Sequence, residues 1–393
     1  MIIAKLFIPG RFEDAYIYMG RLILVTGNLT LRHYNLNEVI ERLELKNSRN
    51  IPAARSLFAR NDWLSTEQFR LQMRNPDIAD AYVRAIRGLG EMIELDDLLS
   101  VEGEQEINLR MDALLDLTIY RRRVYLAADT GLFDMEIGWE ENRLPISQRR
   151  KRFDAPCYNL SASYGTANAS FGEAGLYSFY DDFNTLDWSA VNVQNRGAER
   201  TADVSLRSGW FGEDLINYTG RIDGAILHGD TRELDRPSAG ERKVVTGLSA
   251  NHSDMDFLFQ GLKTKYNLER REVDFVWNST ATLYVQTKTN HFYSAGVQTG
   301  DDGERRVRFS KEYSGGIGRI LAATMVRVGK NPALVAEAYD KVGILVGNKW
   351  QIVTEGQALT VRTFPGSKRY KNLIAITLND GVMLASVFDE ESY

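Results

Sequence analysis

Residues 124–133 read Val124-Tyr125-Leu126-Ala127-Ala128-Asp129-Thr130-Gly131-Leu132-Phe133. An apolar run ends in small residues, a polar turn follows, and a second apolar run begins. This pattern predicts two strands joined by a tight turn, because Gly, Asn and Asp tolerate the positive φ angles that such turns require. A similar phrase occupies 373–384, close to the end of the chain. Recurrence of one phrase indicates a repeated architecture.

Looser copies of the phrase fill in the series between these two. We place the turns near Gly27, Gly131, Gly175, Asp254, Asn290, Gly343 and Gly381. The shorter steps between turns are about 37 to 53 residues, close to the roughly 40–50 residues of one four-stranded β-propeller blade. The two long steps, 27–131 and 175–254, each require an insertion or a further copy. The spacing predicts seven blades, with six or eight as alternatives.

The ends of the chain bear on how such a fold would close. We interpret each phrase as the two inner strands of a blade, where small side chains suit the crowded centre of a radial array. The last copy supplies only two strands, and 1–8 and 15–19 at the N-terminus supply two more. We expect these N-terminal strands to complete the last blade and cover its open edge. An all-β sandwich with similar hairpins is the alternative fold.

Through this phrase-and-turn pattern the chain resembles the β-propeller superfamily over most of its length outside the helical region described below. It lacks the regularly placed Gly-His and Trp-Asp pairs of WD repeats, and Asp187-Trp188 is a single reversed echo. The resemblance implies a rigid body with loops on two faces and a central channel, a shape used for protein interaction more often than for catalysis. Fold alone does not fix function, and no functional residue is carried over from a named family.

Composition narrows the class of protein. The 393 residues suit a single propeller domain over 1–393, and a hydrophobic content of 44% is enough for a large core. The net charge of −5 predicts no bulk attraction to nucleic acid or membranes. One cysteine, Cys157, allows no disulfide within the chain and fits a reducing compartment. The N-terminus has no signal-peptide pattern, and no apolar run reaches the roughly 20 residues of a membrane span. We expect a cytoplasmic protein.

Residues 50–103 lose the strand pattern and are predicted to form a helical insertion within the propeller. Ser65 stands at capping-box spacing before Gln68, and Asn75 is a capping residue placed before a proline. One helical face is expected to carry the residues at i, i+4 and i+8, which are Ile78, Tyr82 and Ile86. The insertion either covers the edge of a blade or docks a partner.

Three short stretches are candidate binding residues. Two are basic, and Arg and Lys can hold phosphates or carboxylates: Arg149, Arg150, Lys151 and Arg152, and further on Lys368 and Arg369. The third mixes an aromatic with acids at the end of a predicted strand, as ligand pockets often do: Tyr180, Asp181 and Asp182. The structural alternatives are solvated charge between blades for the basic runs and packing between blades for the aromatic residue.

The usual motifs of catalysis and metal binding are missing from the sequence. There is no Gly-X-Ser-X-Gly elbow and no phosphate-binding P-loop, and four histidines with one cysteine give no zinc spacing. We predict no catalytic residue, metal ligand or cofactor. The leading hypothesis is a non-catalytic scaffold or recognition module that binds another protein. Two alternatives remain: an enzyme or sensor that holds a small anionic or sugar-like ligand in the central channel, and nucleic-acid binding through the basic loops.

Overall fold

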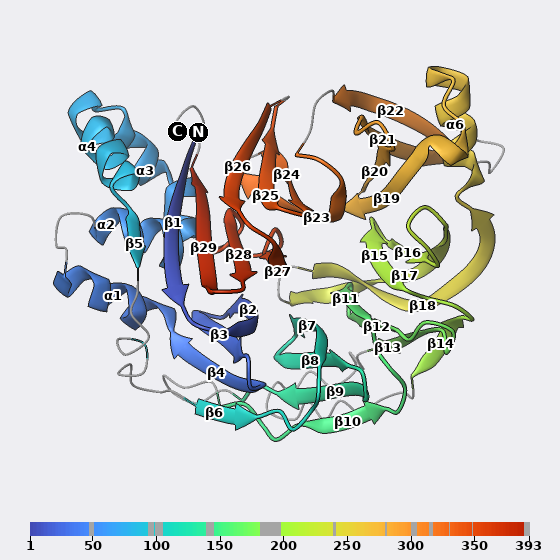
Figure 1. Cartoon of the computed structure of the whole chain (residues 1–393), viewed down its shortest axis with the longest axis horizontal. Helices are drawn as coiled ribbons and strands as arrows, with labels where there is room; N and C mark the ends of the chain where they lie inside the picture. The colour runs from blue at the N-terminus through green and yellow to red at the C-terminus, as the bar shows by residue number, and fades with distance from the viewer. Residues whose placement is uncertain are drawn as a thin grey trace. The chain divides into compact units, whose positions relative to one another are not determined.

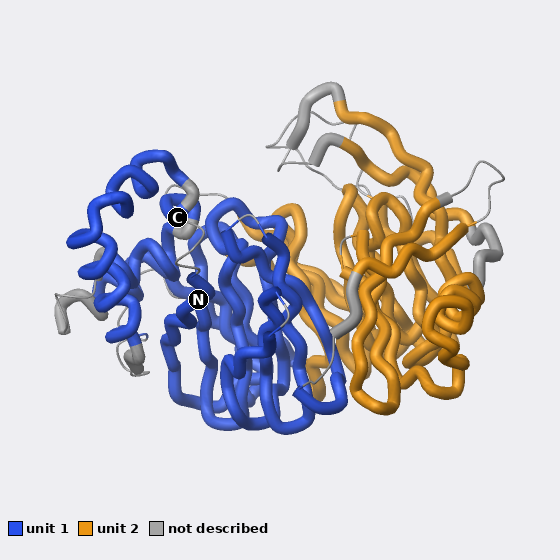
Figure 2. The backbone as a smooth tube through the Cα atoms, turned by 90° about the horizontal axis from the view of Figure 1, so that it is seen from above, with its two compact units in different colours: residues 1–110, 316–393 blue, residues 111–315 orange. Residues whose placement is uncertain are grey.

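The computed structural model describes most of the chain. The described residues are 1–46, 51–92, 98, 105–138, 145–180, 198–238, 241–279, 281–299, 305–313, 317–329, 331–347 and 349–388. Their strands form seven sheets, each built on four antiparallel strands, and these are the blades of a β-propeller (Figure 1). The predicted all-β propeller with seven blades is therefore confirmed. The chain divides into two compact units, 1–110 with 316–393 and 111–315 (Figure 2).

Unit 1, residues 1–110 and 316–393, contains three blades. Blade 1 consists of β2 (Phe12–Tyr18), β3 (Arg21–Thr26), β4 (Thr30–Asn35) and β6 (Gln105–Asn108). Blade 6 consists of β23 (Ile320–Val328), β24 (Asn331–Ala338), β25 (Lys341–Val346) and β26 (Lys349–Glu355). Blade 7 consists of β27 (Ala358–Thr363), β28 (Leu373–Leu378), β29 (Gly381–Phe388) and β1 (Ile2–Pro9), with β5 (Gly90–Met92) added parallel to β1.

Unit 2, residues 111–315, contains four blades. Blade 2 consists of β7 (Leu114–Tyr120), β8 (Arg123–Ala128), β9 (Gly131–Glu136) and β10 (Arg150–Phe153). Blade 3 consists of β11 (Asn159–Ser163), β12 (Thr166–Ser170), β13 (Leu176–Tyr180) and β14 (Glu199–Ala202). Blade 4 consists of β15 (Arg207–Phe211), β16 (Asp214–Tyr218), β17 (Gly224–Ser238) and β18 (Glu241–Asp254). Blade 5 consists of β19 (Val273–Ser279), β20 (Thr282–Thr287), β21 (Phe292–Thr299) and β22 (Arg305–Tyr313).

We label the four strands of each blade A to D in the order of the sheet, with β1 as strand D of blade 7. The A strands of successive blades contact one another within each unit, so they are the inner strands. In an antiparallel blade, the A–B and C–D connections share one edge, which we call the A–B edge. The B–C turn and the connection to the next blade share the opposite edge, which we call the B–C edge.

The N-terminal strand completes the last blade, as predicted. β1 pairs with β29 in antiparallel register from Ile2 opposite Phe388 to Pro9 opposite Gly381 (Figure 1). The second predicted N-terminal strand, 15–19, does not join it. It belongs to β2, which pairs with β3 as strand A of blade 1. A single added strand is sufficient, because β27, β28 and β29 already supply the other three.

The recurring phrase forms strands B and C, the two middle strands of a blade, and not the two inner strands that we predicted. In blade 2 the phrase covers β8 and β9, which lie between β7 and β10. Every residue of β8 is buried. Gly131 at the turn has φ of +140°, and a Cβ there would lie 2.2 Å from the carbonyl oxygen of Phe153 on strand D. The phrase is distinctive because both faces of the middle strands are covered, which favours apolar and small residues throughout.

Two of the seven predicted turns are wrong. Asp254 ends strand D of blade 4 and leads into helix α6, whereas the B–C turn of that blade is 219–223. That turn has five residues, and the strand before it ends in Asn217 and Tyr218 instead of small residues, so the phrase is hidden. Gly343 lies inside β25, and the turn of blade 6 is 339–340. The other five turns fall between strands B and C.

Helices lie between β4 and β6 of blade 1 and after blade 4. They are α1 (Leu36–Lys46), α2 (Ile51–Ala54), a π-helical turn (Arg55–Ala59), a 3-10 turn (Asn61–Ser65), α3 (Glu67–Met73), α4 (Pro76–Arg87), α6 (Asp256–Tyr266) and a 3-10 turn (Arg270–Glu272). None of the described helices is long and apolar enough to cross a membrane.

Helices α3 and α4 of unit 1 begin close to the predicted positions, whereas α1 lies before the predicted insertion. Asn75 caps α4 by accepting a hydrogen bond from the backbone N–H of Asp77 at 3.0 Å. The cap of α3 is Thr66, one residue after the predicted Ser65. On the predicted face of α4, Ile86 is buried and Tyr82 packs 5.7 Å from the ring of Phe388, but Ile78 is exposed. The apolar face of α4 therefore covers β1 and β29 of blade 7 only with its second half.

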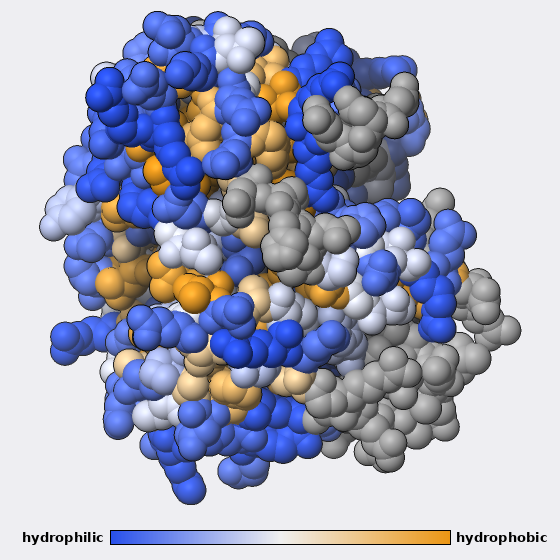
Figure 3. Space-filling view, turned by 90° about the vertical axis from the view of Figure 1, so that its right-hand side faces the viewer, coloured by the Kyte–Doolittle hydropathy of each residue, from blue (hydrophilic) through white to orange (hydrophobic). Residues whose placement is uncertain are grey.

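The outer side of unit 2 is mainly polar. Figure 3 faces the side that carries α6, β22, β18 and β14 in Figure 1, and its coloured part shows mainly hydrophilic side chains with hydrophobic ones visible between them. Strand D of a blade is a sheet edge, and polar or charged side chains there discourage pairing with another chain. The outer strands therefore do not stand out as a binding surface.

Candidate functional site

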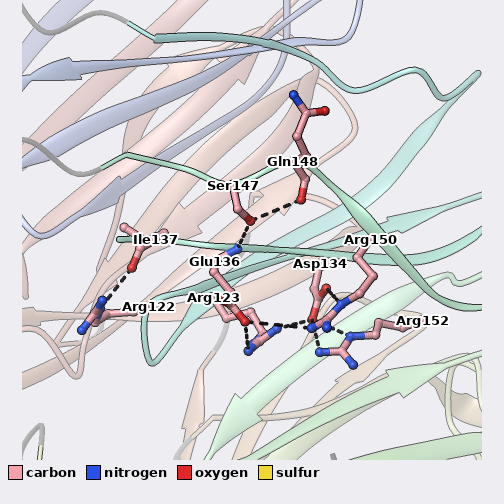
Figure 4. A network of polar contacts seen from close by, with 9 residues as sticks. All are labelled: Arg122, Arg123, Asp134, Glu136, Ile137, Ser147, Gln148, Arg150 and Arg152. Carbon is pink, nitrogen blue, oxygen red and sulfur yellow. Dashed lines mark hydrogen bonds and ion pairs between the residues drawn. The ribbon is translucent and has the colours of Figure 1, made fainter. Parts of the chain in front are cut away.

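The basic run of blade 2 is built into a network around one buried carboxylate (Figure 4). Asp134 on β9 is only 1% exposed and accepts from Arg123 at 2.5 Å, from Arg150 at 3.2 Å and from Arg152 at 2.6 Å. Arg123 also donates to Glu136 at 2.8 Å. We call these five residues the arginine network. It joins strands B, C and D near the A–B edge of the blade.

The charges of the arginine network determine how its groups titrate. Burial by itself would raise the pKa of Asp134, but hydrogen bonds from Arg152 and Arg150 and the charge of Arg123 lower it overall. Burial works against the charged form of Arg123, yet Asp134 and Glu136 raise its pKa. Asp134 is therefore ionised at neutral pH. The guanidinium groups donate inward to that carboxylate, so much of their hydrogen-bonding capacity is already used.

The two other members of the basic run lie against an aromatic ring. The guanidinium of Arg149 stands 4.4 Å from the centre of the Phe133 ring, and among the described residues its Nη1 has no hydrogen-bond partner. Lys151 is exposed, forms an ion pair with Asp154 and lies 5.8 Å from the same ring. All four predicted basic residues are thus close together, and three of them contact carboxylates of their own blade. That they bind a ligand stays a prediction.

The remaining predicted site residues are not brought together in one described cluster. Tyr180 ends β13, packs against Leu215 and Leu248 of blade 4, and burial raises its pKa to about 12. Asp181 and Asp182 lie outside the described residues. Lys368 and Arg369 are exposed in the A–B connection of blade 7 in unit 1. Tyr180 therefore has the packing environment that was the structural alternative for this aromatic residue.

A line of polar contacts that sequence reasoning missed connects the inner strands of unit 2. Asp116 on β7 is buried and accepts from the side chain of Asn159 at 3.0 Å and from the backbone N–H of Leu160 at 2.7 Å, both on β11. Asn159 in turn accepts from the backbone N–H of Ser208 on β15 at 2.9 Å. We call these contacts the inner-strand ties. They fix the starts of three neighbouring A strands relative to one another.

Unit 1 uses the same device. Asp14 on β2 is buried and accepts from the side chains of Thr360 at 3.0 Å and Arg362 at 2.6 Å, both on the neighbouring inner strand β27. Asp14 and Asp116 each stand where the register shifts at the start of strand A. The sequences Phe12–Tyr18 and Leu114–Tyr120 are alike at that point, FEDAYIY and LLDLTIY, which is the signal that would have found them.

Large apolar side chains project from unit 2 directly beside these ties. Leu115, Tyr158 and Leu206 each come one residue before Asp116, Asn159 or Arg207, at the start of strand A in blades 2, 3 and 4. The four members of the patch, which we call the apolar rim, are Leu115 (43% exposed), Tyr158 (48%), Val204 (40%) and Leu206 (46%). All four lie on the B–C edge: Leu115 is in an inner strand, and the others are in the connections that lead into the inner strands of blades 3 and 4.

Short contacts hold the apolar rim in place. Ser205, between Val204 and Leu206, exchanges backbone hydrogen bonds of 2.7 and 2.9 Å with Gly172 in the B–C turn of blade 3. The ring of Tyr158 lies on Gly172, where φ is +62° and an added Cβ would come within 2.9 Å of the ring. Asn217 donates its side-chain amide to the carbonyl of Val204 at 2.8 Å. The rim is therefore a preformed surface on rigid strands, which favours binding without reorganisation.

Two further groups in unit 2 are chemically quiet. Burial and the nearby Asp116 raise the pKa of the Cys157 thiol, so its reactive thiolate form is suppressed. Arg207 follows Leu206, but its guanidinium turns inward between the rings of Tyr218 and Phe275, at 3.8 and 4.7 Å from their centres. Burial lowers the pKa of Arg207 to about 10. In the part of the chain that is described, no group of three or more His, Cys, Asp or Glu side chains is placed to hold a metal.

Comparison with known proteins gives few leads. No family model matches the chain. A valine–tRNA ligase of Streptomyces avermitilis is 21% identical over 235 residues, which are 56% of this chain and 24% of that protein's length. The chain thus matches only a small part of that relative.

Among the solved structures that match the chain are two domains with low sequence identity to it. The β-propeller domain of Cps50 (Swd1) from Myceliophteria thermophila gives a TM-score of 0.49 at 10% identity, with 96% of each chain covered. The N-terminal domain of Nup159 gives a TM-score of 0.44 at 11% identity, with 98% of this chain and 96% of that chain covered. No residue role is transferred from either of them.

Proposed function

We propose that this chain is a non-catalytic β-propeller recognition module that binds another protein through the apolar rim of unit 2. The observation that carries the proposal is the recurrence of an exposed large apolar residue at the same position of three successive inner strands, at Leu115, Tyr158 and Leu206. A single exposed leucine on a surface needs no explanation. Exposed apolar side chains that gather in one patch are a feature of interaction surfaces.

Energetics favour a protein as the occupant of the apolar rim. Burying apolar surface contributes about 25 cal/mol per Å² removed from water. A rigid surface keeps more of this free energy as binding affinity, because few of its side chains and loops have to be ordered on binding. Interfaces are enriched in aromatic anchors at their centres, and Tyr158 supplies one such ring. The arginine network is the weaker candidate, since Arg123 and Arg152 already donate to Asp134.

Affinity purification with the tagged full chain tests the proposal. We expect the wild type to retain a stoichiometric protein partner, and Leu206→Asp to lose at least about tenfold in recovery, since a buried charge would replace an apolar contact. The backbone N–H of Leu206 donates to the carbonyl of Tyr218, which the substitution leaves intact. The matched control is Ile352→Asp, which changes an equally exposed apolar residue on strand D of blade 6.

The control separates loss of binding from loss of folding. In both variants Cys157 should remain protected from thiol reagents, because this single cysteine is buried in unit 2. A partner that is retained equally by Leu206→Asp and the wild type would remove the apolar rim from the proposal. If a partner is lost with Ile352→Asp and not with Leu206→Asp, the binding surface lies in unit 1.

A further inference from the structure

The apolar rim lies among acidic side chains. The B–C edge of blades 2 and 3 carries five exposed carboxylates near the rim, which are Asp112, Asp129, Asp154, Glu173 and Asp203. Asp129 lies in the B–C turn of blade 2 and Glu173 in that of blade 3. Asp154 is in the connection that leads to Tyr158, and Asp203 directly precedes Val204. Acidic residues thus lie close along the chain to Leu115, Tyr158 and Val204.

Only part of this negative charge is neutralised within the protein. Asp154 pairs with Lys151, and Asp203 pairs with Arg200 at 3.4 Å. For Asp112, Asp129 and Glu173, the described residues provide no ion pair. In blade 4, by contrast, charges are matched, because Arg221 pairs with Asp274 at 3.0 Å and Arg270 pairs with Asp223. Of blades 2, 3 and 4, blades 2 and 3, which carry most of the rim, are therefore the ones with unpaired acids among the described residues of this edge.

We infer that the partner segment held by the apolar rim is basic and amphipathic, with Lys or Arg residues flanking aliphatic or aromatic anchors. This inference rests on the proposed function and specifies its partner. The apolar side chains of the segment contact Leu115, Tyr158 and Leu206, while its cations face the acids of the B–C turns. Complementary charges steer association and disfavour partners of the same sign. Nucleic acid and acidic segments are repelled from this edge.

A second copy of the chain is the competing occupant, because its basic run could meet the acidic edge of a neighbour. Such a head-to-tail contact is heterologous and would form rings or open chains of molecules. The donors of Arg123, Arg150 and Arg152 are engaged with Asp134 in the same molecule. A separate basic segment is therefore the better complement, and the oligomeric state of the pure protein distinguishes the two.

Fluorescence anisotropy with three labelled twelve-residue peptides tests the inference on the full chain. One peptide alternates Leu and Lys, the second replaces every Leu by Ser, and the third replaces every Lys by Glu. We expect the Leu–Lys peptide alone to bind, with affinity that weakens as salt rises. Removing two acids by Asp129→Asn with Glu173→Gln should weaken it by about tenfold in low salt and flatten the salt dependence.

Matched variants distinguish the possible failures. Asp380→Asn removes an exposed acid from the B–C turn of blade 7 in unit 1 and should leave binding unchanged. Leu115→Ser with Leu206→Ser should abolish binding of the Leu–Lys peptide. Equal binding of the Leu–Glu peptide, or no effect of the acid-removing pair, would overturn the inference but leave the protein-binding proposal standing. Self-association in analytical ultracentrifugation that Glu173→Gln abolishes would identify the second copy as the occupant and also overturn it.

Discussion

The two edges of blade 2 differ in how far their charged side chains are paired. At the A–B edge, Arg123, Arg150 and Arg152 converge on Asp134 and are largely satisfied inside their own blade. At the B–C edge, Leu115 is exposed, and Asp112 and Asp129 on the same edge have no ion pair among the described residues. Three of the four cations in the densest basic run thus already pair with carboxylates, whereas at the B–C edge apolar and acidic side chains remain without such contacts. A conspicuous charge run is weak evidence for binding until its partners are known.

The largest effect should follow from breaking the structural side of this contrast. We expect Asp134→Asn to lower the free energy of unfolding by about 3 kcal/mol at pH 7, because the nearly buried Arg152 would lose its counter-charge and Arg123 would keep only Glu136. Urea denaturation followed by circular dichroism measures the loss, and exposure of Cys157 reports on unit 2 directly. Glu136→Gln is the control: Glu136 is half-exposed and contacts Arg123, so its loss should cost under about 1 kcal/mol.

Lowering the pH should reduce the difference in stability between the wild type and Asp134→Asn. The folded pKa of Asp134 is lowered, so this carboxylate contributes stability at any pH above the unfolded pKa of about 3.9. That contribution is lost as the pH falls through the folded pKa. The difference in stability should therefore be full at pH 7 and shrink below about pH 4. A difference that stays constant down to pH 3 would show that the loss comes from packing and not from the charge of Asp134.

An intermediate effect should follow from loosening the ties beneath the apolar rim. Asp116→Asn places an amide where Asn159 and Leu160 donate, so we expect a loss of about 1–2 kcal/mol in stability. Affinity for the Leu–Lys peptide should also fall about threefold, because Leu115 and Tyr158 lose their fixed positions. Asp14→Asn is the matched control, since it breaks the equivalent tie in unit 1. Equal affinity in both variants would mean that the rim does not depend on the inner-strand ties.

The parts of the fold that the sequence predicted are those set by local residue pattern. The B–C phrases are recognisable because both faces of these strands are buried and their turns need Gly, Asn or Asp, as at Gly131 and Asn290. The turn after Tyr218 was missed because neither its length nor its flanking residues follow that pattern. The inner-strand ties join residues about 40 or more positions apart, and their role follows only from pairing between strands.

The candidate site was harder to predict for a physical reason. Sequence shows that Arg149 to Arg152 are basic, but not that Asp134 lies beneath three arginines. Leu115, Tyr158 and Leu206 look like ordinary strand residues, and only the three-dimensional arrangement shows that they are exposed in neighbouring blades. No sequence motif identifies side chains that the fold leaves exposed and without contacts. The available clue was a large apolar residue directly before Asp116 and before Asn159, and it can be recognised only once the blades are aligned.

The smallest effect should come from the exposed part of the basic run. Arg149→Gln with Lys151→Gln removes two cations that contact the Phe133 ring, so we expect a loss of under about 1 kcal/mol in stability. Partner recovery and peptide affinity should not fall, because Asp134 keeps its three arginines and the apolar rim is unchanged, and the loss of Lys151 leaves Asp154 free to meet the cations of the peptide. Affinity purification with this double variant complements the test with Leu206→Asp, because it changes the basic run and leaves the apolar rim intact. If the pair loses the partner while Leu206→Asp retains it, the A–B edge is the docking surface and the roles of the two edges are exchanged.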